Sequence, residues 1–123
     1  MGDVAIREAR SSDASVIIRF LRAMLDEMAS MGGHAVSQNS AAWERVENII
    51  HDQCGTESHL YLIAERDDPV RTPIGFAEAS VLGPYPLLEP KRVLHVHALY
   101  VREAHRRRGV GLALLEALVN WGQ

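Results

Sequence analysis

The chain has 123 residues, enough for one domain with its own hydrophobic core but not for two, so we expect a single domain over residues 1–123. Hydrophobic residues make up 47% and charged residues 24%, a profile typical of a folded globular protein rather than a disordered one. The 13 Lys and Arg against 16 Asp and Glu give a net charge of −3, which argues against a general nucleic-acid partner.

Two further features narrow the class of protein. No apolar run is long enough to span a membrane, and residues 1–13 lack the apolar stretch of a secretory signal, so we expect a cytoplasmic protein with no membrane partner. Cys54 is the only cysteine, which excludes a disulfide within the chain and a thiolate zinc cluster. We expect a buried, unreactive thiol there.

The first half of the chain predicts one strand and two helices. A short strand over residues 4–7 precedes Ser11, Ser12 and Asp13, any of which can cap a helix. Apolar residues then follow helical spacing until Gly32 and Gly33 end the helix. A second apolar stripe predicts a helix that starts at Ser37, Asn39 or Ser40 and ends near Cys54. Its apolar positions are Trp43, Val46, Ile49 and Ile50.

The second half predicts three strands. Residues 59–65 form a nearly continuous apolar run, typical of a central strand, and residues 74–81 form its hairpin partner after a turn that finishes at Pro73. Three prolines keep residues 83–91 irregular. Residues 93–101 alternate, which predicts one face with Val93, His95, His97, Leu99 and Val101 and the other with Leu94, Val96, Ala98 and Tyr100.

A basic loop with two glycines follows this strand and opens a helix. Gly109 and Gly111 allow positive φ and close approach of a ligand to the main chain. Three guanidiniums and the free N–H groups of a helix N-terminus then meet in one small volume, which favours an anion such as phosphate. The alternative is a solvated turn. The helix is expected to bury the stripe Leu112, Leu115, Leu118 and Val119.

The strand, the loop and the helix together resemble a known signature. The run Leu99-Tyr100-Val101, then Arg106-x-x-Gly109-x-Gly111, then Leu112 onward is similar to the acetyl-CoA-binding motif of the GCN5-related N-acetyltransferases, Q/R-x-x-G-x-G/A. The likeness covers roughly residues 94–118. It implies an α/β protein with a mixed sheet, the acyl-CoA N-acyltransferase fold, in the order β-α-α-β-β-β-α.

The resemblance also implies a cosubstrate and the residues that hold it. Acetyl-CoA would bind without a metal, with its pantetheine arm against main-chain groups of Leu99, Tyr100 and Val101. The pyrophosphate would lie on the basic loop, held by Arg106, Arg107, Arg108, Gly109, Val110, Gly111 and Leu112.

The implied reaction is transfer of the acetyl group to a primary amine of a small molecule or peptide, with a base to remove a proton from the amine. His97, His95 and Glu78 are the candidates for this catalytic base. The alternative for each histidine is an ordinary strand residue, and a histidine pair without a third ligand indicates no metal. The segment between the first two helices would help to bind the acceptor, through His34, Gln38, Asn39 and Trp43, or would be a solvated loop with a core tryptophan.

One departure from the family pattern concerns the C-terminal third. Family members continue with a fifth strand, a fourth helix and a closing strand, whereas this chain stops at Gln123, so we expect a C-terminally truncated form. The last strand and helix would then expose apolar surface, which favours a homodimer. The alternative function is a non-catalytic CoA-binding or degenerate module that acts through self-association or a partner.

Overall fold

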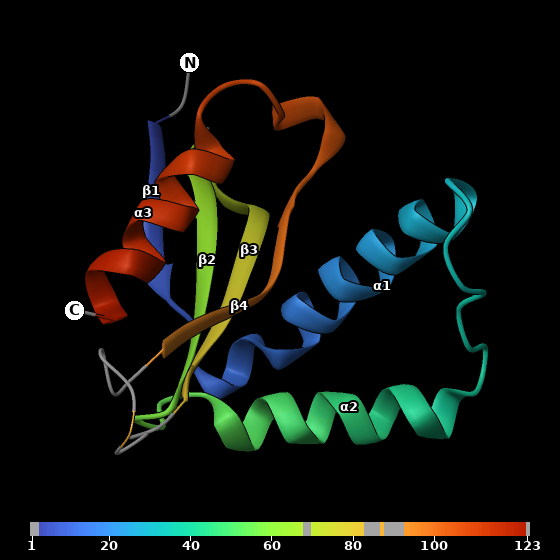
Figure 1. Ribbon diagram of the computed structural model, residues 1–123. Helices are drawn as coiled ribbons and strands as arrows, with labels where there is room; N and C mark the ends of the chain where they lie inside the picture. Colours follow the sequence, from blue (N-terminus) through green and yellow to red (C-terminus); the bar gives the residue numbers. More distant parts are fainter. Residues whose placement is uncertain (1–2, 68–69, 83–86, 88–92, 123) are drawn as a thin grey trace.

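The computed structural model describes residues 3–67, 70–82, 87 and 93–122. Its helices and strands confirm the predicted order β-α-α-β-β-β-α, with two short 3₁₀ turns, η1 and η2, added (Figure 1). The elements are β1 (Asp3–Glu8), η1 (Ser11–Asp13), α1 (Ala14–Ser30), α2 (Ser40–Gln53), β2 (His59–Asp67), β3 (Arg71–Leu82), β4 (Val93–Val101), η2 (Glu103–His105) and α3 (Val110–Gly122).

The four strands form one sheet in the order β1-β2-β3-β4, and each neighbouring pair is antiparallel. Helix α3 covers one face, while α1 and α2 lie on the other (Figure 1). Each face has its own core. The core under α3 is built around Leu60, Leu62, Ile74, Leu114 and Leu118. The core under α1 and α2 is built around Ile17, Phe20, Ile50, Ile63 and Phe76. The central strands β2 and β3 are therefore buried on both faces, as the apolar run of β2 predicts, whereas β1 and β4 are more exposed.

A β-bulge in β4 overturns the predicted alternation of that strand. Glu78 pairs with Ala98 and Ala79 with Val96, so His97 is an extra residue between two pairs. An extra residue reverses which face the following side chains occupy. Leu94 accordingly packs in the core under α3, but Ala98 lies in the core under α1 and α2. The prediction that even-numbered residues of β4 share one face was wrong.

The hairpin between β2 and β3 is longer than predicted. β3 begins at Arg71, so Pro73 lies inside the strand rather than at the end of a turn. Pro73 pairs with Glu65 next to a register shift at Ala64, a bulge site of the kind where a sheet tolerates proline. The irregular segment expected over residues 83–91 lies outside the described residues except for Leu87, which is exposed in a turn.

The buried side of α3 also differs from the prediction. Leu114 and Leu118 are fully buried, whereas Leu112, Leu115 and Val119 are exposed. Apolar residues surround most of this helix, so their spacing alone does not select the side that faces the sheet. α3 thus has a second apolar stripe, Leu112, Leu115 and Val119, that is exposed at the surface.

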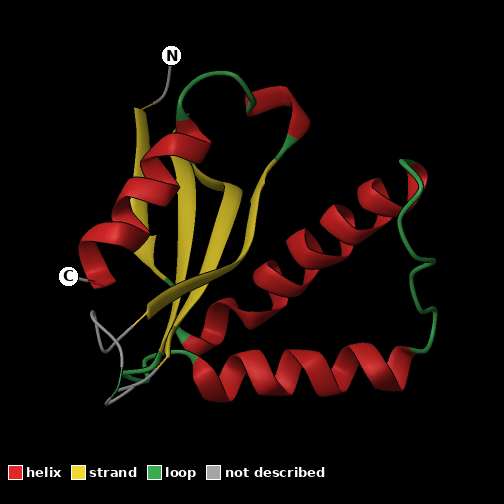
Figure 2. Ribbon diagram, viewed as in Figure 1, coloured by secondary structure: helices red, strands yellow, loops and turns green. Residues whose placement is uncertain are grey.

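The connections of α1 and α2 agree with the sequence pattern. Gly32 takes a φ of 97° just after α1, as expected for a helix that ends at glycine. A long loop leads to α2 (Figure 2). Among the three candidates for its cap, Asn39 holds the position, because its side chain accepts hydrogen bonds from Ala41 N at 2.9 Å and Ala42 N at 3.3 Å. In the described part of the chain, no helix is long and apolar enough to cross a membrane.

Candidate functional site

The basic loop between β4 and α3 has an unusual backbone. Arg107 has a φ of 62° and Gly109 a φ of 81°, so both residues occupy the left-handed region. The positive φ predicted for Gly109 is confirmed. Gly111 instead lies in the first turn of α3, and Arg107 takes the second left-handed position. A non-glycine residue in this region is uncommon, and strained backbone of this kind tends to cluster at functional sites.

This backbone leaves a row of hydrogen-bond donors open. The main-chain N–H groups from Arg107 to Leu112 have no hydrogen-bond partner among the residues that the structure describes. The first bond across the start of α3 runs from Ala113 N to Gly109 O, at 3.0 Å. In the sequence, no carboxylate lies between Glu103 and Glu116. Free N–H groups at left-handed turns and at a helix N-terminus together form an anion site.

Arg106 differs from the other arginines of the loop, because the protein already binds its guanidinium. Nη1 and Nη2 donate to the two carboxylate oxygens of Glu27 at 2.6 and 2.7 Å, and Nε donates to Val101 O at 2.7 Å. The guanidinium also lies 5.3 Å from the centre of the Tyr100 ring. Arg106 therefore ties the loop to α1 and to the end of β4 rather than presenting its charge to a ligand.

The charges that remain open are those of Arg107 and Arg108, which are both exposed. Their setting is strongly positive. Burial lowers the pKa of His105, and the nearby charges of Arg66, Arg108 and Arg102 lower it further. Positive charge is thus concentrated at this end of a protein whose net charge is −3. Val110 is buried and anchors the start of α3, whereas Leu112 faces outward.

A shallow groove of about 290 Å³ runs from the loop along β4. β4 is the edge of the sheet, so its outer main-chain groups face no further strand within the described residues. The predicted contacts of the pantetheine arm all lie on this groove. Its lining residues are Met24, Glu27, Met28, Met31, Leu99, Tyr100, Val101 and Arg106.

The two histidines of β4 lie side by side at the bulge. Their rings stack with centroids 4.5 Å apart, and His97 Nε2 lies 2.6 Å from Ser80 Oγ. Ser80 is buried, so this hydrogen bond fixes the His97 ring, and both rings remain exposed. His97 therefore has one nitrogen held by the protein, while the other, Nδ1, has no hydrogen-bond partner among the described residues.

Glu78 lies next to this pair, because it faces Ala98 across the ladder beside the bulge. One of its oxygens is 3.2 Å from Tyr61 Oη, which also lies 2.7 Å from Gln53 Oε1. Burial raises the pKa of Tyr61, and Glu78 raises it further, so Tyr61 stays protonated and can donate a hydrogen bond. The structure thus places the three candidate bases around the bulge of β4: Glu78 is opposite Ala98, His97 is the extra residue, and His95 is opposite Ser80.

The predicted acceptor residues already contact the protein itself. Trp43 Nε1 donates to Ser37 O at 2.8 Å, Arg22 Nη2 donates to Gln38 Oε1 at 3.1 Å, and Asn39 caps α2. His34 and Trp43 line an apolar groove of about 400 Å³ between α1 and α2. Cys54 is half-buried, and burial, with smaller effects of Asp13 and Glu8, raises the pKa of its thiol.

Sequence reasoning missed Glu27, Ser80 and Tyr61. Each contacts a predicted residue from a distant part of the chain, as Glu27 does across 79 positions, and no local motif marks such a pair. In the described part of the chain, no group of three or more His, Cys, Asp or Glu side chains is placed to hold a metal ion.

The sheet, the helices and the open loop together define the acyl-CoA N-acyltransferase fold that was predicted. The family model described as the acetyltransferase (GNAT) family matches residues 20–123, so the chain belongs to this family. Membership supports acyl transfer as its general chemistry. No curated protein sequence matches the chain.

Solved structures share the fold at low sequence identity. A predicted acetyltransferase from Clostridium acetobutylicum, solved with acetyl-CoA, has a TM-score of 0.76 at 18% identity, over 96% of this chain and 72% of that one. A GCN5-related N-acetyltransferase from Ralstonia eutropha has a TM-score of 0.74 at 20% identity, over 96% of this chain and 74% of that one. An aminoglycoside N-acetyltransferase in complex with CoA has a TM-score of 0.73 at 20% identity, over 99% of this chain and 70% of that one.

Proposed function

We propose that this protein transfers an acetyl group from acetyl-CoA to a primary amine of a small molecule or peptide. The observation that supports the proposal best is the row of unpartnered N–H groups from Arg107 to Leu112, beside two exposed arginines. Acetyl-CoA is bound in a structural neighbour, and another neighbour acts on aminoglycosides, which carry amines. A cytoplasmic setting is part of the proposal.

The loop fits the pyrophosphate of acetyl-CoA. Its N–H groups and the charges of Arg107 and Arg108 would hold the phosphates, while Arg106 keeps the loop in place through Glu27. Main-chain groups at the outer edge of Leu99, Tyr100 and Val101 would hydrogen-bond the pantetheine arm. The cosubstrate supplies an activated acetyl thioester, so the protein needs to orient it, stabilise the charge that develops on its oxygen and remove one proton from the amine.

His97 is the base that the geometry supports best. If its Nε2–H donates to Ser80 Oγ, the lone pair of Nδ1 is free to accept a proton from the attacking amine. A bond then forms between the amine nitrogen and the acetyl carbon, the carbon–sulfur bond breaks, and CoA leaves with its sulfur. His95 packs against the His97 ring, and Glu78 offers a carboxylate nearby to balance the positive charge.

Substitution of Gly111→Asp tests the loop directly. It adds negative charge in the first turn of α3, beside the N–H groups that would hold the pyrophosphate, so CoA affinity, measured by calorimetric titration, should fall about tenfold or more. Asn120→Asp adds the same charge at the exposed far end of α3 and should change affinity less than about twofold. Equal affinities in the two variants would refute the assignment of the loop.

His97→Ala tests the base. Turnover, followed as release of free CoA thiol on a panel of amines, should fall about 100-fold or more while CoA affinity stays the same. His51→Ala removes an exposed histidine of α2 and serves as the matched control. Unchanged turnover in His97→Ala would move the role to Glu78 or His95. Binding of CoA with no thiol release on any amine would support the non-catalytic alternative.

A homodimer is a further part of the proposal. The apolar stripe of Leu112, Leu115 and Val119 on α3 is exposed, as are Val96 and Leu99 on the edge strand β4. Sedimentation velocity should show a dimer that Leu115→Glu combined with Val119→Glu converts to monomer. A wild-type protein that sediments as a monomer at micromolar concentration would contradict this.

A further inference from the structure

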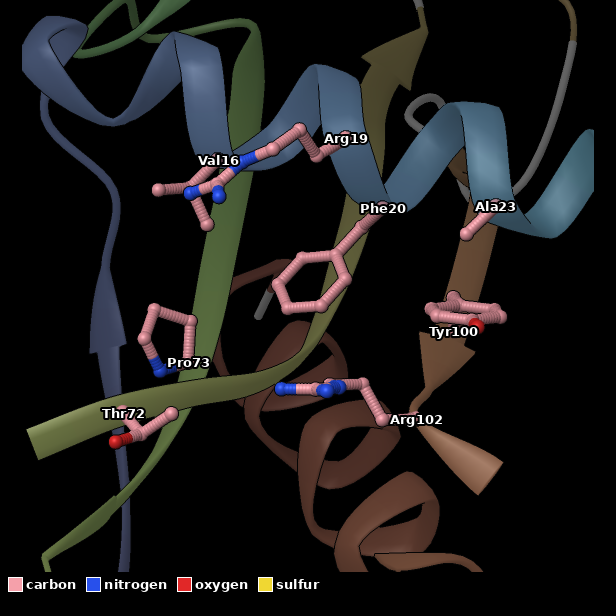
Figure 3. A pocket seen from close by; sticks show the side chains of 8 residues that line it. All are labelled: Val16, Arg19, Phe20, Ala23, Thr72, Pro73, Tyr100 and Arg102. Atoms are coloured by element: carbon pink, nitrogen blue, oxygen red, sulfur yellow. The ribbon is translucent and has the colours of Figure 1, made fainter. Parts of the chain in front are cut away.

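A second pocket lies between α1 and the adjoining ends of β3 and β4. It is separate from the basic loop of residues 106–112, which is called the phosphate loop below because of its proposed ligand. Its volume is about 340 Å³, and none of residues 106–112 lines it. Figure 3 shows its eight lining side chains, which come from three elements and from the residue that follows β4. They are Val16, Arg19, Phe20, Ala23, Thr72, Pro73, Tyr100 and Arg102.

Two guanidiniums extend into this pocket without a protein partner. Arg19 comes from α1 and its side chain ends beside Val16, whereas Arg102 directly follows β4 and its guanidinium lies on the other side of the Phe20 ring (Figure 3). Neither guanidinium makes a hydrogen bond or an ion pair to any residue that the structure describes, and no carboxylate lines the pocket. By contrast, Arg7 and Arg106 each pair with a carboxylate within 3 Å.

The remaining walls are apolar and well fixed. Phe20 is almost fully buried and stacks on Phe76, with ring centroids 6.1 Å apart. The Phe20 ring also packs against the Tyr100 ring, with centroids 5.9 Å apart, and Pro73 forms another wall of the pocket. Because both rings pack into the core under α1 and α2, the apolar surface exists before any ligand arrives.

We propose that this pocket binds a small organic anion, with a carboxylate or phosphate group between Arg19 and Arg102 and an apolar body against Phe20 and Pro73. Both arginines are exposed and unpaired among the described residues, so an oxyanion can accept charged hydrogen bonds from them without displacing a protein carboxylate. The volume suits a small molecule or one end of a larger one. Such an anion can be a free metabolite or the 3′-phosphate of CoA itself.

Calorimetric titration of the whole chain with phenyl phosphate, benzoate and benzylamine tests the proposal. The two anions should bind and the amine, which carries a similar ring with the opposite charge, should not. Arg19→Gln and Arg102→Gln should each weaken phenyl phosphate about tenfold, because each removes a charged hydrogen-bond donor. Arg45→Gln removes an exposed arginine of α2 and should leave the affinity within about twofold.

Competition with CoA separates the two sources of the anion. If saturating CoA abolishes phenyl phosphate binding and Arg19→Gln also weakens CoA, the pocket holds part of CoA. If phenyl phosphate binds equally well with CoA present, the pocket takes an independent anion. Gly111→Asp should leave phenyl phosphate binding intact, so failure of the phosphate loop and failure of this pocket are distinguishable. Absence of binding by both anions, binding that neither arginine variant changes, or equal binding of benzylamine would overturn the proposal.

Discussion

The three consecutive arginines after β4, Arg106, Arg107 and Arg108, differ in their contacts. Arg106 is held by Glu27 and by Val101 O, and Glu27 lies on α1, far away in the chain. Arg107 and Arg108 remain open, and Arg107 adopts the left-handed backbone that turns the loop. The sequence predicts that this loop is basic, but it does not show which guanidinium is used inside the protein.

The pair of Glu27 and Arg106 should control the order of the loop. The hydrogen bond from Arg106 lowers the pKa of Glu27. The ion pair is therefore fully formed when the pH is above 4.5, the ordinary pKa of Glu, and it is lost as the pH falls through the lowered pKa. At neutral pH, Glu27→Gln should speed amide hydrogen exchange at His105 and Arg106, whose N–H groups donate to Arg102 O and Glu103 O, because the charged bond that holds Arg106 in place is gone. Asp26→Asn, an exposed neighbour on α1, is the control. Identical exchange in both variants would contradict this role.

Gly75 occupies a position where β3 and β4 approach closely. A Cβ there would lie 2.6 Å from Tyr100 O and 3.3 Å from Val101 Cα, both main-chain atoms that cannot move aside cheaply. Gly75→Ala should therefore lower the free energy of unfolding by about 1–3 kcal/mol in urea denaturation. Gly111→Ala meets only side-chain atoms at 3.9 Å and should be neutral or stabilising. Equal stability of the two variants would contradict the close approach.

At the scale of the elements, periodicity predicts the existence and order of helices and strands but not their local irregularities. The stripe of α1 has helical spacing, whereas the apolar run of β2 is identified as a strand by its short length and by the turn that follows it. The bulge at His97 adds one residue without any local signal, and it splits the predicted face of β4. In α3, Leu112 and Leu114 are equally apolar, so only the sheet decides which one is buried.

The start of α2 offers a test at this scale. Asn39 Oδ1 accepts hydrogen bonds from two otherwise free N–H groups, so Asn39→Ala should cost about 0.5–2 kcal/mol in the free energy of unfolding. Asn39→Ser keeps a capping oxygen and should recover most of that loss. Asn48→Ala, at an exposed position in the middle of α2, should not destabilise. A stable Asn39→Ala variant would show that the long loop before α2 does not depend on this cap.

At the scale of the whole molecule, a charged network connects β1, η1 and β2, which come from distant parts of the chain. Arg7 on β1 donates to Asp13 at 2.8 Å and to Glu65 on β2 at 2.9 Å. The hydrogen bond from Arg7 lowers the pKa of Asp13 below its ordinary 3.8. The unfolded chain then binds more protons than the folded one in acid, so stability rises with pH across this range.

Acid titration checks this network. Its contribution should be complete above about pH 5 and lost as pH falls through the lowered pKa of Asp13. In urea denaturation, Asp13→Asn should lower stability at pH 7 but reduce the further loss between pH 5 and about 3. Asp26→Asn should behave as the wild type at both pH values. An Asp13→Asn protein with the full acid dependence would exclude this network as its cause.

The order of the strands has a consequence for how the chain folds. No helix separates β2 from β3 or β3 from β4 in the described chain, whereas β1 reaches its partner β2 only after the chain has passed through α1 and α2. Closing that long loop costs more conformational entropy than forming the adjacent strand pairs. We expect the three-stranded meander to form first and β1 to dock last. The same strand should be the first to detach in partial unfolding, and because no residue of β1 lines the pocket beside Arg19 and Arg102, both this pocket and the basic loop between β4 and α3 should outlast that step.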